Sequence, residues 1–366
     1  MTVYLEALDN DKGQALLLHY GDEADPRVAL VDGGPRNSYD EVLRPRLERL
    51  RHRRGGTLEV DLVVVSRAVD DHALGILDLC DELVLLDQSE SGDEDVPYLI
   101  DDLWHNSWDD LLGPQADEVL RACRERIGGS DPHAALGRVA GLSASSADLI
   151  AHVPQGRRLR QNSALLDLHL NQGLDLITSA AGRVDLGHGL SLTVLAPSDA
   201  GIDRLREQCV GIAPQRVLEF VEGPLHEAAN LVLLAETEHR RMLLAGGASA
   251  DVVMAALEEA GLTADNTPRL DLVAFSPGGA DQAGRRDLAR RVSAERWLLC
   301  GDGDADPARW EGLLETLRDG EAPSEVAISG VSDEILADGL KQRLESAFGR
   351  PLRTRDAGQS GLRLRL

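Results

Sequence analysis

Residues 66–75 read Ser-Arg-Ala-Val-Asp-Asp-His-Ala-Leu-Gly, and this stretch decides the fold assignment. It begins at the end of Val60–Ser66, a continuous apolar run of the kind that forms a fully buried strand. A helix is predicted from Asp71 to about Leu79, after the short loop. Carboxylate and imidazole groups therefore stand at the end of a buried strand, where functional loops are commonly placed. Asp71 and His72 are the first candidate site residues.

Upstream of this stretch, three short apolar runs with polar or glycine breaks predict an antiparallel sheet. They cover Val3–Leu8, Ala15–Tyr20 and Val28–Val31. An Asp-Gly-Gly turn that starts at Asp32 ends the third run. We expect this aspartate to accept hydrogen bonds from loop amides and the glycines to allow a tight turn. Leucines at helical spacing then predict a helix over about Tyr39–Arg54.

Downstream, the pattern is helical over about 107–165, and strands then alternate with helices. The predicted strands are Leu190–Leu195, Asn230–Ala235, Arg241–Ala245, Leu270–Ser276, Arg296–Cys300 and Glu325–Ile328, and the predicted helices are Ala250–Ala260, Asp287–Val292, Pro307–Leu317 and Asp333–Phe348. Two halves of this kind fit an α/β fold built as a four-layer αββα sandwich. We expect a single domain over 1–366, with a helical insertion at about 107–165 and a C-terminal β-α extension at 320–366 packed on the domain.

The order of the motifs resembles the metallo-β-lactamase superfamily, in particular the branch shared with competence-type DNA-uptake proteins. The matching segments are the turn at Asp32-Gly33-Gly34, the loop at 66–75, the strand that begins at Asn230, Leu243-Leu-Ala-Gly-Gly247, Leu272-Val-Ala-Phe-Ser-Pro-Gly-Gly279 and Asp306-Pro307. Each motif alone is weak, and their shared order over about residues 3–320 makes the resemblance specific. It implies the four-layer fold and, in the family, a site in which one or two metal ions activate water for hydrolysis.

The residue types that hold metal in the family are mostly missing from the matching positions. Only Asp71 and His72 remain of the family's His-x-His-x-Asp-His loop, because its two leading histidines match Arg67 and Val69. The family's bridging aspartate matches Gly247, its paired histidines match Pro277 and Gly278, and its late histidine matches Asp306. A catalytic zinc site normally has three protein ligands and an open position, so two remaining ligands do not make a stable site.

The resemblance therefore predicts that no metal cofactor is bound. The exception would be a zinc or manganese site completed by His188, His226 or another residue outside the motifs. Arg67 suggests how the chain could fold without the metal, because the positive charge of a guanidinium can replace that of a metal ion beside carboxylates. One hypothesis is that Arg67 pairs with Asp71 and seals the former cleft. The other is that Arg67 is a solvated loop residue.

Net charge and composition limit the kinds of partner that the chain can bind. The 38 lysines and arginines against 63 aspartates and glutamates give a net charge of −25, which disfavours binding to the phosphate backbone of nucleic acids. The four cysteines are far apart without a Cys-x-x-Cys motif, and we expect them to be buried thiols in a reducing compartment. Residues 1–10 lack the features of a signal peptide, and no apolar run reaches about 18 residues. We expect a cytoplasmic protein without a membrane span.

Four other segments have a structural interpretation that outweighs a functional one. Trp104–Trp108 is expected to pack in the core, and the arginines of Arg44–Arg54 to be solvated at a helix end. The basic group Arg157–Arg160 could grip a phosphate or an acidic partner, although it is too small to outweigh the overall charge. The acidic stretch Glu82–Asp95 lacks the spacing of a calcium loop and is expected to be a solvated loop.

Two functions remain open from the sequence. The favoured one is a catalytically degenerate metallo-β-lactamase-fold protein that acts by binding, as a regulatory or scaffolding subunit with protein partners, or by sensing a small ligand in the old cleft. The alternative is a hydrolase of phosphodiester, ester or amide bonds with a reduced metal site. The oligomeric state is not predicted.

Overall fold

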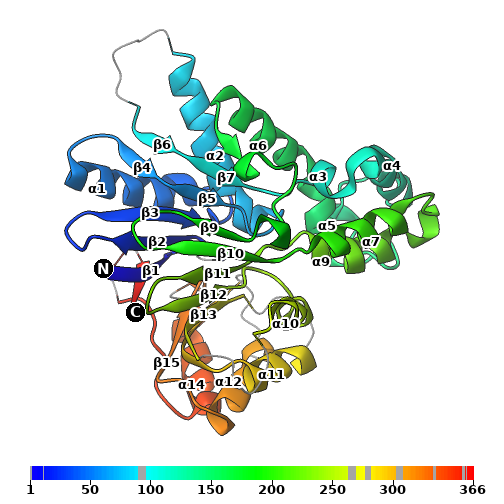
Figure 1. The fold of residues 1–366 in the computed structure, drawn as a ribbon. Helices are drawn as coiled ribbons and strands as arrows, with labels where there is room; N and C mark the ends of the chain where they lie inside the picture. Colours follow the sequence, from blue (N-terminus) through cyan, green and yellow to red (C-terminus); the bar gives the residue numbers. More distant parts are fainter. Residues whose placement is uncertain are drawn as a thin grey trace.

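The computed structural model describes residues 2–10, 12–89, 96–262, 269–276, 282–301, 308–332, 335–356, 359 and 361–366 of the chain. Two seven-stranded sheets lie face to face, and helices cover the outer face of each (Figure 1). The first and last strands pair at the edge of one sheet, so the two ends of the chain lie close together.

The first sheet has the strand order β16-β1-β2-β3-β5-β7-β8. Strands β4 and β6 form a separate two-stranded sheet. Its antiparallel part contains β16, β1, β2 and β3, and its parallel part continues from β3 through β5 and β7 to β8. The bounds are β1 Thr2–Leu8, β2 Leu16–Gly21, β3 Pro26–Val31, β4 Leu58–Val60, β5 Leu62–Val64, β6 Tyr98–Ile100, β7 Asp102–Trp104, β8 His169–Leu170 and β16 Gly361–Arg365. The ends of β3 and β5 therefore lie side by side.

The second sheet has the strand order β15-β14-β13-β12-β11-β10-β9. Strands β9 to β12 are antiparallel, and β12 to β15 are parallel. The bounds are β9 Arg183–Asp185, β10 Ser191–Ala196, β11 Val232–Glu236, β12 Arg241–Leu244, β13 Leu270–Phe275, β14 Ala294–Cys300 and β15 Glu325–Ser329. Each sheet thus combines an antiparallel half with a parallel half.

Alternating apolar side chains of the two sheets form the central core. Leu5, Leu18 and Val64 of the first sheet pack in one cluster with Leu244 and Leu298 of the second. Because successive residues of a strand point to opposite faces, the other set of side chains packs against the outer helices. Those are α1 (Arg44–Arg54), α2 (Asp70–Asp87) and α6 (Val153–Leu165) on one side, and α10 (Ala250–Glu259), α11 (Gln282–Arg291), α12 (Ala308–Asp319) and α14 (Lys341–Phe348) on the other. The four-layer αββα sandwich predicted from the sequence is confirmed.

A group of short helices lies at one end of the sandwich, and we call residues 108–153 and 199–229 together the helical cap (Figure 1). Its helices are α3 (Trp108–Leu112), α4 (Ala116–Arg126), α5 (Ala144–Ala151), α7 (Asp199–Cys209), α8 (Val217–Phe220) and α9 (His226–Ala228). Helices are predicted from the sequence over 107–165 but not over 199–229. Ile202, Leu205 and Cys209 are buried at helical spacing, so the missed signal was present.

Shorter helical turns join these elements. They are η1 (Tyr39–Leu43), η2 (Gly113–Gln115), η3 (His133–Ala135), η4 (Asn171–Gly173), η5 (Ser179–Ala181), η6 (Pro214–Arg216), η7 (Val221–Leu225) and η8 (Leu336–Leu340). The turn η1 runs directly into α1, and η7 runs directly into α9. The second of these junctions places His226 near the end of β5 and the start of β11.

Helix α2 is longer than predicted. It ends at Asp87, so the first part of the acidic stretch Glu82–Asp95 is helical rather than a loop. Leu79 and Leu83 continue the buried face of the helix, and this apolar spacing outweighs the acidic composition. Residues 90–95 of the same stretch lie outside the described residues.

The arginines of α1 are not all solvated, contrary to the prediction. Arg46 is 1% exposed, and its Nε and Nη2 donate to the two carboxylate oxygens of Glu6 at 2.9 and 2.7 Å. His19 Nε2 also contacts Glu6, at 3.0 Å. Burial alone would raise the pKa of Glu6, but the hydrogen bonds with His19 and Arg46 outweigh burial and hold it well below its usual range. A buried ion pair therefore joins α1 to β1.

The remaining general predictions concern the cysteines and the membrane. All four cysteines are free and buried, as predicted. Within the described residues, no helix has both the length and the apolar composition that a membrane span requires.

Candidate functional site

The Asp32 carboxylate lies at the centre of the candidate site. Asp32 follows β3, is fully buried, and has a positive φ of 61°, a conformation that aspartate tolerates better than most residues. Its carboxylate accepts hydrogen bonds from the Ser66 amide at 2.7 Å, the Ser66 hydroxyl at 2.6 Å and Gln14 Nε2 at 3.1 Å. The expected structural role of Asp32, as an acceptor of loop hydrogen bonds, matches these contacts.

His72 lies in the first turn of α2 and completes this network. Its Nδ1 is 2.8 Å from Asp32 Oδ2, and its side chain is 2% exposed. Burial would lower the pKa of His72, but the carboxylates of Asp32 and Asp71 outweigh it and raise the pKa above its ordinary value. The net effect favours an imidazolium that pairs with Asp32 inside the protein.

Two glycines bring α2 against the loop that follows β3. The Gly33 amide donates to the carbonyl of His72 at 2.7 Å, and the Gly75 amide donates to the carbonyl of Gly34 at 3.2 Å. A Cβ atom on Gly75 would lie 1.9 Å from the Gly33 oxygen. The distance between Asp32 and His72 therefore depends on close backbone contact between α2 and the loop after β3, at positions where neither glycine has a side chain.

Arg67 does not pair with Asp71. Within the described part of the chain it forms no ion pair with that residue, and its Nη2 contacts Nε2 of His226 instead. A Cβ atom on Gly247 would lie 2.8 Å from Arg67 Cδ and 3.4 Å from His72 Nε2. Arg67 therefore fills the space beside the position that the family's bridging aspartate would occupy. The predicted Arg67–Asp71 pair was wrong, and so was the alternative of a solvated loop residue, because Arg67 is only partly exposed.

The backbone explains the direction of Arg67. Arg67 and Asn230 form an isolated antiparallel bridge, and the Leu231 amide donates to the Ser66 carbonyl at 2.7 Å. Residues that face each other across an antiparallel pair project to the same side. Arg67 and Asn230 therefore project to the same side, where Arg67 contacts His226, and the bridge joins the loop after β5 to the segment before β11.

His226 is neutral in this environment. Burial and the positive charge of Arg67 lower its pKa to about 3, so at neutral pH Nε2 can accept a hydrogen bond from the guanidinium. His226, a possible extra metal ligand from the sequence, lies at the site with its ring nitrogen in contact with an arginine. His188 lies elsewhere, exposed in the turn before β10 and against Gly21.

The residues present do not fit the metal centre that the fold family implies. Arg67 and buried Val69 stand where two histidines would be needed, and Gly247 offers no carboxylate. Across the described residues, no group of three or more His, Cys, Asp or Glu side chains is placed to hold an ion. Pro277, Gly278 and Asp306, which match three further ligand positions, lie outside the described residues. A guanidinium beside His72 would repel a cation brought to that ring.

Further charged groups lie around the cleft. Asp148 of α5 has Asp71, Asp70, His133 and Arg67 near it, and its carboxylate is 3.6 Å from His133 Nε2. Burial, with the negative charge of Asp71, raises the pKa of Asp148. Asp70 accepts from His152 Nδ1 at 3.1 Å. We call Asp70, Asp71 and Asp148 the acidic rim. This group was not identified from the sequence, because α5 and α2 are far apart along the chain.

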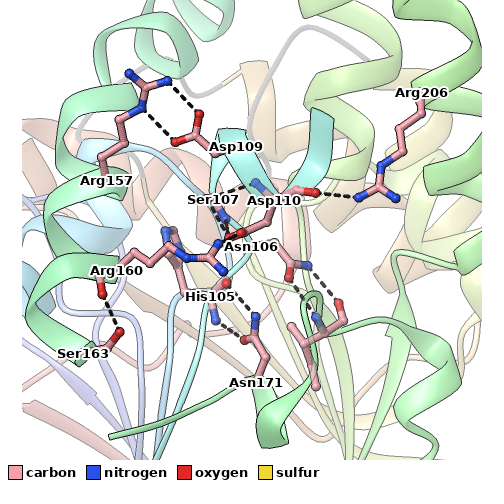
Figure 2. A network of polar contacts seen from close by, with 11 residues as sticks. His105, Asn106, Ser107, Asp109, Asp110, Arg157, Arg160, Ser163, Asn171 and Arg206 are labelled. Atoms are coloured by element: carbon pink, nitrogen blue, oxygen red, sulfur yellow. Dashed lines mark hydrogen bonds and ion pairs between the residues drawn. The ribbon is translucent and has the colours of Figure 1, made fainter. Parts of the chain in front are cut away.

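A second polar network lies under the helical cap (Figure 2). Asn171 accepts from the His105 amide at 2.8 Å and donates to its carbonyl at 3.0 Å, while the Ser107 hydroxyl donates to Asp110 at 2.6 Å. Arg157 pairs with Asp109, and Arg160 contacts Asp110. The arginines of the basic group Arg157–Arg160 thus pair with carboxylates of the same chain. Trp104 and Trp108 are buried, in line with the expected core role.

The buried imidazole of His105 makes the free energy of unfolding depend on pH. Burial, helped by the nearby His152 and Arg160 charges, lowers the pKa of His105 from 6.5 to about 3. The unfolded chain therefore takes up a proton near pH 6.5, whereas the folded chain does not until pH 3. Stability from this residue is fully present above pH 6.5 and is lost as the pH falls toward 3.

We expect His105→Phe to reduce the loss of unfolding free energy between pH 7 and pH 5 by about 2 kcal/mol. Urea unfolding at the two pH values measures this difference. The control is His52→Phe, which replaces a histidine that is 72% exposed. An identical pH dependence in His105→Phe and the parent chain would contradict the buried, neutral state of His105.

Several solved structures are similar to this chain. A metallo-β-lactamase fold protein, YhfI from Bacillus subtilis, is 10% identical with a TM-score of 0.43, and the match covers 100% of both chains. Zn²⁺-bound PqqB from Methylobacterium extorquens is 10% identical with a TM-score of 0.44, over 99% of this chain and 100% of that one. The short form of human tRNase Z is 11% identical with a TM-score of 0.36, over 99% and 98%. No protein-family model and no curated protein matches the sequence.

These TM-scores are below 0.5, so the fold assignment rests on the strand order and the four layers of this chain. The resemblance predicted from the sequence concerns the same fold, the metallo-β-lactamase sandwich, as the first of these structures. What those proteins bind or catalyse does not carry over to a chain that shares about a tenth of their residues.

Proposed function

We propose that the chain is a catalytically degenerate metallo-β-lactamase-fold protein that acts by binding, as a regulatory or scaffolding subunit of a cytoplasmic assembly. The observation that carries the proposal is the position of Arg67. Its guanidinium lies beside Gly247 and His72 and contacts His226. A positive charge beside the residue that matches the family's bridging aspartate supports a cleft that recognises charged groups rather than one that holds a hydrolytic metal.

The chemistry of the cleft favours recognition over hydrolysis. Metal-dependent hydrolysis needs an ion with an open position for water, and three protein ligands usually hold it. The Nε2 of His226 contacts Arg67, so this imidazole is not free to act as a base. The net charge of −25 supports solubility and a partner that is a protein rather than a nucleic acid.

Metal analysis joined to activity assays tests this proposal. Protein purified without chelators is expected to hold far less than one zinc or manganese ion per chain. It is also expected to show no turnover of generic phosphodiester, ester or amide substrates. The matched variant is His72→Ala, which should change neither metal content nor background activity. Stoichiometric zinc or manganese that is lost in His72→Ala, with hydrolysis lost in parallel, would replace the proposal with a working hydrolase.

A further inference from the structure

We propose that the groove between α7, α9 and α10 binds a small organic cation, a molecule with an apolar body and one primary ammonium group. The groove lies where the helical cap meets α10, an outer helix of the second sheet (Figure 1). Of the described residues that line it, none is Asp32, Arg67, His72 or His226. The site is therefore separate from the candidate site and goes beyond the proposed function.

Two helices form the walls of the groove. The residues of α7 that line it have the spacing i, i+3, i+4 and i+7 from Gly201 to Gln208, and those of α10 have the same spacing from Val252 to Glu259. Residues at this spacing share one face of a helix. One face of each helix, about two turns long, therefore borders the groove.

Small residues leave the space between these walls. Gly201 has no side chain, and Ala228, Ala255 and Ala256 each carry a single methyl group. The cavity has a volume of about 220 Å³. An apolar cavity of about 150 Å³ can hold a benzene molecule, so this groove has room for a ring with a one-carbon arm.

Buried apolar residues form the bottom of the groove. Leu195 and Ala196 at the end of β10 and Leu205 of α7 line it, and all three are at most 6% exposed. A ligand with an apolar body removes its own surface and that of the groove from water, which favours binding. A bare inorganic cation gains nothing from this surface.

Two carboxylates without a counter-ion also line the groove. They belong to Glu227 of α9 and Glu259 of α10, and both side chains are exposed. Among the described residues neither has a hydrogen bond or ion pair, whereas the adjacent Glu258 pairs with Arg291. Partial burial and the negative charge of Asp251 raise the pKa of Glu227, because the chain does not compensate its charged form. The ammonium group of a ligand supplies the missing positive charge.

Arg204 of α7 brings the opposite charge to the lining but does not neutralise these carboxylates. In the described part of the chain it pairs with neither of them, and the charge that acts on Glu227 is that of Asp251. The described lining thus has two carboxylates for one guanidinium, in a chain with a net charge of −25. This excess of negative charge attracts a cation and repels an anion of the same shape.

Ligand-observed NMR titration of the full chain with four probes tests the proposal. Benzylamine has the ring and the ammonium group, benzyl alcohol has the same shape without the charge, benzoate has the opposite charge, and methylamine lacks the apolar body. We expect benzylamine to bind about fivefold or more tightly than any of the other three, the effect of a well-placed ion pair.

Ala255→Leu tests the location of the site. Ala255 is exposed, so the larger side chain fills the groove without disturbing buried packing, and benzylamine binding should be lost. Ala164→Leu, which changes an exposed alanine of α6, is the matched control and should leave binding unchanged.

Removal of the two carboxylates tests the charge. The double variant Glu227→Gln with Glu259→Gln should bind benzylamine no more tightly than benzyl alcohol. Glu238→Gln is the control, because Glu238 is 85% exposed in the turn between β11 and β12. It should keep the preference for benzylamine.

Four results would overturn the proposal. Equal affinity for benzylamine and benzyl alcohol would leave an apolar groove without selection for charge, and tighter binding of benzoate would assign the groove to anions. Benzylamine binding that survives Ala255→Leu would place the ligand elsewhere, and no binding of benzylamine would remove the site. None of these results concerns metal content or hydrolysis, so the proposed function is tested separately.

Discussion

Gly75→Ala is expected to destabilise the chain by about 4 kcal/mol or more, a loss that would prevent stable folding of many proteins. The new Cβ would lie 1.9 Å from the Gly33 oxygen and 2.7 Å from the Gly33 carbonyl carbon. Both are backbone atoms of a buried loop, so no side-chain rotation can relieve the overlap. Helix α2 would have to move away from the loop after β3, which would separate His72 from Asp32. Urea unfolding followed by circular dichroism measures the loss.

Gly156→Ala in α6 is the matched control. Its new Cβ would meet His105 Nε2 at 3.5 Å and the Ser107 Cβ at 3.7 Å, which are ordinary contacts. Alanine has a higher helix propensity than glycine, so this variant should be neutral or more stable by up to about 1 kcal/mol. Similar stability in the two variants would show that the approach of Gly75 to Gly33 is not a determinant of the fold.

Arg46→Met is expected to lower the free energy of unfolding by about 3–5 kcal/mol. The substitution leaves the Glu6 carboxylate buried at 1% exposure without the two hydrogen bonds that Arg46 donates. His19 and Arg363 remain near Glu6 but cannot replace a bidentate guanidinium. Chemical denaturation at neutral pH measures the difference.

Arg49→Met on the same helix is the control for that experiment, because Arg49 is exposed. Its effect should stay within about 0.5 kcal/mol, as for most surface substitutions. If Arg46→Met cost no more than Arg49→Met, the Glu6–Arg46 pair would have no net part in stability.

The layers of the fold could be predicted from the sequence because they depend on local patterns. The apolar run at Val60–Ser66, the alternation of strands and helices, and the order of the turns each mark an element without knowledge of its neighbours. The same patterns did not reveal which arginine is buried. Arg46 lies in a basic helix whose composition indicates solvent, and its partner Glu6 is forty residues earlier on another element.

The candidate site was predicted in part for the same reason. Asp32, Asp71 and His72 belong to local motifs, and Arg67 stands in the same loop as Asp71 and His72. The predicted partner of Arg67, Asp71, was wrong. The position of Arg67 depends on the bridge to Asn230, which lies more than 160 residues later in the chain. Asp148 carries no motif at all. It reaches the rim only through the packing of the helical cap.

Diffraction from crystals grown with zinc, recorded on both sides of the zinc absorption edge, tests the central claim most directly. The claim is that Arg67 stands in place of a hydrolytic metal. It predicts Arg67 against His226 and Gly247, with no anomalous peak between Asp71 and His72. Arg67 turned to solvent, with a zinc peak on Asp71 and His72, would contradict it.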